Sequence, residues 1–265
     1  FLFTQTSLGL GSRDYYVENR TQLVSKVKMA FTYPIIVAVV AVLVIIALLT
    51  YVVPQVVQVF NQTRQDLPLL TLILIRTSDF IRNWGWLVLL GLGGAWAAFH
   101  YSLKAPTARL SFHSKLLNMP MFGRLVRGIN AARFASTLAI LTASGVPLIR
   151  ALEAGADTLN NTAMKAEVRE ALGRVREGAP LARALGAGKT LPPLLIHMTA
   201  SGEATGELPQ MLERAAETLS QEVERKTLTM TTLLEPILIL ITGGIVLMIV
   251  LAVLLPIIEI NQLVK

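Results

Sequence analysis

PILILITGGIVLMIVLAVLLPII, residues 236–258, decides the class of fold, because it carries no charged side chain over a length that can cross a membrane. A helix of about 20 apolar residues spans the hydrocarbon core of a bilayer. Two other stretches share this property, PIIVAVVAVLVIIALLTYVV at 34–53 and WGWLVLLGLGGAWAAFHYSL at 84–103. Hydrophobic residues make up 53% of the chain and charged residues 15%, which is too apolar for a water-soluble globule. The sequence therefore predicts an all-α membrane protein with three transmembrane helices.

Basic residues near the ends of the spans predict their orientation, because Lys and Arg are enriched on the cytoplasmic side. With the first segment inside, the inner flanks carry Arg20, Lys26, Lys28, Lys104, Arg109, Lys115, Arg225 and Lys226. The outer flanks then carry Arg64, Arg76, Arg82 and Lys265. This bias predicts a cytoplasmic N-terminus, outward-facing segments at 54–83 and 259–265, and one sizeable cytoplasmic domain at 104–235.

The outward loop contains the apolar run LPLLTLILI, residues 67–75. It is too short to cross a bilayer and is followed by charged residues. We expect this run to form a helix that lies on the membrane surface.

Glycine and proline divide the domain at 104–235 into short helices, since glycine ends helices and proline is accepted in their first turn. Helix breaks are predicted at 145–147, 160–161 and 178–180. No sustained alternation of apolar and polar residues predicts a strand. After Pro209 an apolar stripe recurs every three to four residues, and this amphipathic helix can run through 227–232 into the third span. The pattern predicts antiparallel helices joined by short turns.

The stretch SGEATGEL, residues 201–208, has the glycines, acids and hydroxyl of an active-site loop. Gly202 and Gly206 permit a tight turn between two helices, and Glu203 and Glu207 can accept backbone N–H groups at the next helix start. A docking role for the exposed acids is compatible with that structural role. Ser201 belongs to the same candidate turn or partner-docking site.

Glu235 and Pro236 mark the edge of the third span. The Glu235 carboxylate can reach the cytoplasmic surface as an amphipathic side chain, or it can pair with a basic residue of a partner. Both residues are therefore candidate structural or docking positions.

Catalytic, cofactor and metal sites are not expected. GAGKT at 186–190 ends like a phosphate-binding loop, but Arg183 stands where the motif needs its first glycine. His100, His113 and His197 have no second ligand at metal spacing, and the chain has no cysteine. The net charge of +7 is not arranged in an aromatic-interleaved basic stripe, so lipid headgroups are a better counter-charge than nucleic acid.

HMTASGEATGELPQMLERAAETL (197–219), LLEPILIL (233–240) and LLPIIEINQLV (254–264) closely resemble the type II secretion system protein F family, which is related to the type IV pilus protein PilC. RFASTLAILTASGVPLIRALE (133–153) and VREGAPLARAL (175–185) resemble earlier stretches of the same family. The resemblance implies a non-enzymatic, multi-pass platform of the bacterial inner membrane, without a cofactor, with its tail in the periplasm. It also implies six-helix cytoplasmic domains, each followed by membrane helices.

The resemblance further implies partners. They are the secretion ATPase of the E type, its membrane recruiters of the L and M types, the pseudopilins, membrane lipid and further copies of the chain. The expected function is to couple the ATPase to pseudopilin assembly and protein export.

An internal repeat is expected from the same resemblance, because Pro34 aligns with Pro236 at an offset of 202 positions. Residues 1–33 then read as the cytoplasmic remnant of a first domain. The leader FLFTQTSLGLGSR at 1–13 does not match its counterpart EATGELPQMLERA at 203–215.

Two other functions remain as alternatives. A type IV pilus platform of the PilC kind would handle a different filament subunit. A small transporter or channel would need ionisable groups within its spans, and the predicted spans contain only His100.

Overall fold

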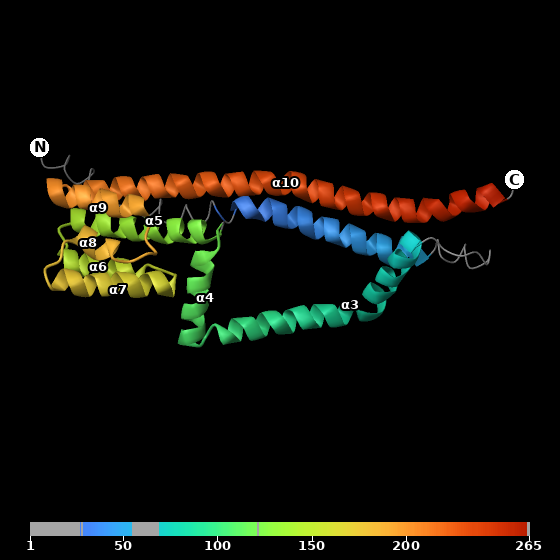
Figure 1. Cartoon of the computed structure of the whole chain (residues 1–265), viewed down its shortest axis with the longest axis horizontal. Coiled ribbons are helices and arrows are strands. Elements are labelled where there is room, and N and C mark those ends of the chain that lie inside the picture. Colours follow the sequence, from blue (N-terminus) through green and yellow to red (C-terminus); the bar gives the residue numbers. More distant parts are fainter. Residues whose placement is uncertain (1–26, 28, 55–68, 121, 264–265) are drawn as a thin grey trace, which may run out of the picture. The chain divides into compact units, whose positions relative to one another are not determined.

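The computed structural model describes residues 27, 29–54, 69–120 and 122–263 (Figure 1). These residues are helical with short turns, and no strand occurs among them. The predicted all-α class is therefore confirmed. The expectations for the leader at 1–13 and for most of the first-domain remnant lie outside the described residues.

Chain contacts separate two compact units. Unit 1 includes Tyr101–Thr229, and unit 2 combines Ala30–His100 with Met230–Lys265. Each unit is described by itself below.

Among the described residues, most of the long apolar helix segments belong to unit 2. Two helices are long and apolar enough to cross a membrane, Met29–Val52 and the segment Leu208–Leu254 of α10 (Leu208–Leu263). A third candidate span is obtained when α3 (Leu69–Ser102) is counted together with α4 (Pro106–Asn118). The predicted second span lies within α3. These helices confirm a helical membrane protein.

Helix Met29–Val52 lies beside the C-terminal part of α10 and runs in the same direction (Figure 1). Near the start of the pair the Tyr33 hydroxyl donates a long hydrogen bond of 3.4 Å to the Glu235 carboxylate. The two residues are 202 positions apart, which is the offset of the sequence repeat. Farther along, a buried apolar cluster joins the helices; its members are Leu49, Val53, Leu74, Ile249 and Ala252.

The first helix ends in a π-helical turn, η1 (Leu48–Val52), before Pro54. The Val53 N–H bonds to the Leu48 carbonyl, and proline has no N–H to offer the next carbonyl, that of Leu49. The Ser78 hydroxyl of α3 donates to this Leu49 carbonyl and is itself buried. A neighbouring helix thus supplies the donor that the proline removes.

The same arrangement recurs in α10. The Ala252 carbonyl would accept from the N–H of residue 256, which is a proline. The buried Thr71 hydroxyl of α3 donates to the Ala252 carbonyl at 2.7 Å instead. Helix α3 therefore satisfies one proline-freed carbonyl on each of its two partners.

The sequence predicts a helix on the membrane surface at 67–75, and its place relative to a membrane stays a prediction. The described part of the run is the first portion of the long helix α3, and Thr71 and Leu74 within it are buried in protein. The Thr71 hydroxyl joins this portion of α3 to α10 through the Ala252 carbonyl.

Unit 1 contains α4, six further helical segments and short turns. They are α5 (Phe122–Ala143), α6 (Leu148–Asp157), α7 (Thr162–Arg176), α8 (Leu181–Gly186), α9 (Pro193–Thr205) and the first part of α10. Gly145 and Gly178 follow α5 and α7 with φ of 76° and 94°, a left-handed conformation that glycine adopts without steric cost. Asn161 caps α7 by accepting the Ala163 and Met164 N–H groups.

The core of unit 1 is aliphatic, with one large aromatic side chain. Its most completely buried large side chains include Phe134, Leu138, Leu152, Met164, Leu195 and Leu212. Burying a side chain of this size stabilises a fold by about 1.5–3 kcal/mol. A methyl group added at Gly155 of α6 would lie 3.0 Å from both Phe134 and Leu138 of α5, so glycine permits the close approach of these helices.

A polar network ties α4, α5 and α7 together beside this core. Asn130 is 5% exposed, and its side-chain oxygen accepts the backbone N–H groups of Asn160 and Asn161. The His113 Nδ1 accepts the Thr162 N–H at 3.0 Å. Burial, followed by the nearby Arg109 charge, lowers the pKa of His113 below its ordinary value of 6.5. The neutral ring therefore suits this acceptor role.

Candidate functional site

The junction between α9 and α10 is shorter than the sequence predicted. Ser201, Gly202 and Glu203 still belong to α9, and only Gly206 and Glu207 separate the helices. Gly206 has φ of 75°, where a side chain would strain the backbone. Ser201 and Glu207 are exposed.

At Gly202, α9 lies close against the start of α10. A Cβ atom added there would lie 2.8 Å from the Leu208 Cα and 3.1 Å from the Met211 Cβ. Backbone atoms cannot move aside cheaply at such a distance. A residue without a Cβ atom is therefore required at position 202 for α10 to begin at Leu208.

Glu203 holds a helix that lies earlier in the chain. Its carboxylate accepts the Leu181 N–H at 2.5 Å and the Ala182 N–H at 2.8 Å, which are the first amides of α8. These amides have no partner within the helix, and the helix dipole favours a negative charge at this end. The sequence predicted the next helix start as the acceptor's target, so this partner corrects that expectation.

Glu167 makes a similar contact with the GAGKT loop, residues 186–190, whose sequence ends like a phosphate-binding loop. Its carboxylate accepts the Lys189 N–H, the Thr190 N–H at 3.0 Å and the Thr190 hydroxyl. A Cβ at Gly188 would lie 2.3 Å from the Glu167 carboxyl carbon. The loop amides that could face a phosphate are thus occupied by a side chain of α7. Sequence reasoning missed Glu167, because nothing local marks a partner 22 positions away.

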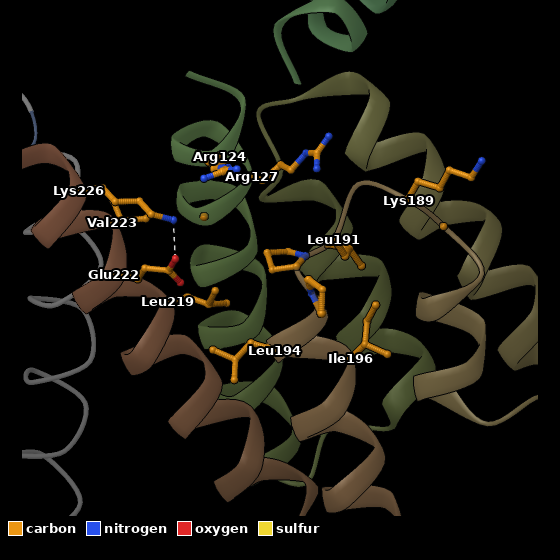
Figure 2. Close-up of a pocket in the computed structure, with 14 residues that line it drawn as sticks. Arg124, Arg127, Lys189, Leu191, Leu194, Ile196, Leu219, Glu222, Val223 and Lys226 are labelled. Carbon is orange, nitrogen blue, oxygen red and sulfur yellow. Dashed lines mark hydrogen bonds and ion pairs between the residues drawn. The ribbon is translucent and has the colours of Figure 1, made fainter. Parts of the chain in front are cut away.

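A pocket of about 540 Å³ opens between α5, the loop before α9, α9 and α10 (Figure 2). Its charged lining residues are Arg124, Arg127, Lys189, Glu222 and Lys226. The apolar lining includes Leu191, Pro192, Pro193, Leu194, Ile196, Leu219 and Val223. Sequence reasoning missed this pocket too, because its cations come from three separated segments.

Glu235 lies in the middle of α10, with its carboxylate next to the Tyr33 hydroxyl. Pro236 follows it inside the same continuous helix. Among the described residues, no group of three His, Cys, Asp or Glu side chains is placed to hold a metal ion. The candidate sites therefore offer carboxylate anchors and a basic pocket for binding.

Comparisons with known proteins identify the family of this chain. The family described as "Type II secretion system (T2SS), protein F" matches residues 134–256, which include both carboxylate contacts and the α9–α10 junction. Type II secretion system protein F of Pseudomonas aeruginosa is 46% identical over 94% of this chain and 62% of its own length. The chain belongs to the type II secretion system protein F family.

Two further relatives, a protein F and a PilC protein, are also similar over most of the chain. Type II secretion system protein F of Aeromonas hydrophila is 42% identical over 94% of the chain and 64% of its own length. Type IV pilus assembly protein PilC of Pseudomonas aeruginosa is 32% identical over 94% of the chain and 67% of its own length. The chain thus spans a little over three fifths of the protein F relatives it matches.

Proposed function

We propose that this chain works as a non-enzymatic assembly platform of a bacterial type II secretion system in the inner membrane. The observation that carries the proposal is the 46% identity to a protein F over 94% of the chain. The spans and the helical unit 1 are consistent with a membrane-anchored binding domain.

The carboxylate contacts support binding rather than catalysis. Glu167 and Glu203 each accept two backbone N–H groups, so in this structure their carboxylates hold the GAGKT loop and the start of α8. Purified chain is expected to hydrolyse no ATP. Turnover above a no-protein blank would contradict the platform proposal.

The proposed partners are the secretion ATPase, its membrane recruiters and the pseudopilins, and the chain is proposed to act as a homo-oligomer. Helix α10 supports a coupling role, because one continuous helix includes both Leu208 at the junction and the apolar span. In this proposal Gly202, Glu203 and Gly206 shape the junction. Ser201 and Glu207 are exposed for docking, and Glu235 with Pro236 marks the membrane edge.

Co-purification tests the platform function. Tagged chain is co-expressed with the secretion ATPase and major pseudopilin of its own gene cluster, crosslinked in cells and purified in mild detergent. Recovery of both partners is expected. Recovery of neither, while an unrelated three-span protein behaves identically, would refute the proposal.

The orientation is also a proposal: unit 1 in the cytoplasm and the C-terminal tail in the periplasm. The chain has no cysteine, so single cysteines report cleanly on exposure. An impermeant maleimide should label Gln262→Cys in intact spheroplasts and Gln210→Cys only after permeabilisation. The reverse pattern would invert the proposed topology.

A pilus platform is the second candidate, because PilC proteins are similar over nearly the whole chain. Their identities of 32–36% are below the 39–46% of the protein F relatives. Co-purification with a major pilin in preference to a pseudopilin would favour this candidate.

A further inference from the structure

The basic pocket of unit 1 carries more positive charge than its surroundings neutralise. Lys226 pairs with Glu222 on α10. Within the described part of the chain, the side chains of Arg124 and Lys189 have no carboxylate or hydrogen-bond partner. Arg127 donates one N–H to the Leu117 carbonyl at 3.1 Å, and its buried Nε has no partner there. A buried guanidinium nitrogen without an acceptor is costly unless a ligand supplies one.

These cations lie on different sides of the pocket. Figure 2 shows Lys226 with Glu222 on α10 at one side and Lys189 on the loop at the other, with Arg124 and Arg127 between them on α5. A single small oxyanion would pair with only one of these cations. A ligand with several carboxylates along an extended chain can meet all of them.

The surface between the cations is apolar. Leu191 and Leu219 are buried, and Leu194 and Ile196 contribute to the same lining. None of the lining residues that the structure describes is aromatic, so they offer a nucleotide base no ring to stack on. Aliphatic surface flanked by Arg and Lys suits a peptide whose leucine-like side chains alternate with glutamates or aspartates.

We propose that this pocket docks an acidic segment of a partner protein, with apolar side chains on its aliphatic floor and carboxylates on Arg124, Arg127 and Lys189. The inference rests on the proposed function for one premise, that the chain works by binding proteins. Glu222 pairs with Lys226 in this structure and is displaced when a partner carboxylate takes its place.

Fluorescence anisotropy with the full chain in a neutral detergent tests the proposal. The probe is a short labelled peptide of leucines and glutamates, and its control is the same peptide with glutamines. The test variant is Arg124→Glu with Lys189→Glu, because both side chains are exposed and make no contacts that the fold needs. The matched control is Arg214→Glu, an exposed cation of α10 outside the pocket.

The glutamate peptide is expected to bind saturably and the glutamine peptide is not. The double variant should weaken binding by about tenfold or more, and Arg214→Glu should leave it unchanged. Glu222→Gln should tighten binding, since it frees Lys226. Raising the salt from about 50 to about 500 mM should weaken binding of the unmodified chain.

Absence of peptide binding to the unmodified chain, or equal binding by the double variant, would overturn the proposal. Displacement of the peptide by equimolar inorganic phosphate would reassign the pocket to a compact oxyanion. Displacement by phosphatidylglycerol vesicles, but not by phosphatidylcholine vesicles, would reassign it to lipid. Co-purification of the ATPase and pseudopilin is a separate measurement, so failure of this pocket and failure of the platform function are distinguishable.

Discussion

Units 1 and 2 both use side chains to satisfy backbone groups that their helices leave unpaired, but they use opposite chemistry. In unit 1 the carboxylates of Glu203 and Glu167 accept backbone N–H groups. In unit 2 the hydroxyls of Thr71 and Ser78 donate to backbone carbonyls. These two contacts of unit 1 use charged acceptors, and these two contacts of unit 2 use neutral donors.

The difference follows from the surroundings of each contact. Glu203 and Glu167 are partly exposed, so water offsets part of the cost of holding a charge there. Thr71 and Ser78 are 3% and 2% exposed, and the helices of unit 2 expose many large hydrophobic side chains. A carboxylate at such a position would be strongly disfavoured. The unpaired backbone group decides whether an acceptor or a donor is needed, since an N–H needs an acceptor and a carbonyl needs a donor. The exposure of the position decides whether the side chain can carry a charge.

The largest effect is expected for Glu203→Ala. Two amides at the start of α8 would lose a charged acceptor, so the free energy of unfolding should fall by about 2–4 kcal/mol. Thermal unfolding by circular dichroism would measure the loss, and hydrogen exchange should increase at Leu181 and Ala182. The matched control is Glu207→Ala, an exposed acid in the same junction, which should change stability by less than about 0.5 kcal/mol. Equal effects of the two variants would refute the anchoring role.

The contact at the GAGKT loop should respond somewhat less, because part of the loop is exposed. Glu167→Ala and Gly188→Ala are each expected to destabilise unit 1 by about 1–3 kcal/mol, since the added methyl group displaces the same carboxylate. The double variant should cost little more than either single one. Full additivity in a double-mutant cycle would show that Gly188 acts independently of Glu167.

Removing a hydroxyl in unit 2 should have a smaller effect. Thr71→Val is expected to destabilise the helix packing by about 1 kcal/mol, as is typical of hydrogen bonds between membrane helices. In a Pro256→Ala background the restored N–H can satisfy the Ala252 carbonyl, so Thr71→Val should cost less there. Thr77→Val is the control, because the Thr77 hydroxyl bonds to Ile73 of its own helix. An unchanged cost in the Pro256→Ala background would contradict this account of the proline.

The smallest effect is expected for His113. Its neutral ring nitrogen Nδ1 accepts the Thr162 N–H, a role that carboxylates have for other backbone N–H groups of unit 1. Its pKa is lowered in the folded chain by burial and by Arg109. The unfolded chain therefore binds more protons below pH 6.5, so the free energy of unfolding should fall as the pH drops from 6.5 through the lowered pKa. Above pH 6.5 this contribution is constant. His113→Gln should remove the slope that thermal unfolding reports over this range.

Much of unit 1 could be predicted from local sequence. Gly145, Gly178 and Asn161 mark helix ends through backbone chemistry that acts within a few residues, and the breaks were predicted at these places. The apolar stripe after Pro209 likewise predicted a helix that continues into the third span, and α10 is continuous. Local rules sufficed wherever the interacting groups are neighbours in the chain.

The partners of the side-chain contacts could not be predicted in this way. The Glu203 carboxylate was expected to accept N–H groups at the start of the next helix. It accepts instead from amides 21 and 22 positions earlier in the chain. The partner of Thr71 in the run at 67–75 lies 181 positions away and could not be predicted from the run itself. Such pairs depend on how helices pack, and a single sequence contains no direct signal of that packing.

The proline-freed carbonyls also bear on the order in which the chain is made. The ribosome completes the helix that ends at Pro54 before it reaches Ser78, so the Leu49 carbonyl enters the bilayer ahead of its donor. The carbonyl of Ala252 emerges when Thr71 has long been synthesised. The first helix therefore gains the donor for its free carbonyl only when α3 has been made, whereas the last helix is made after its donor already exists.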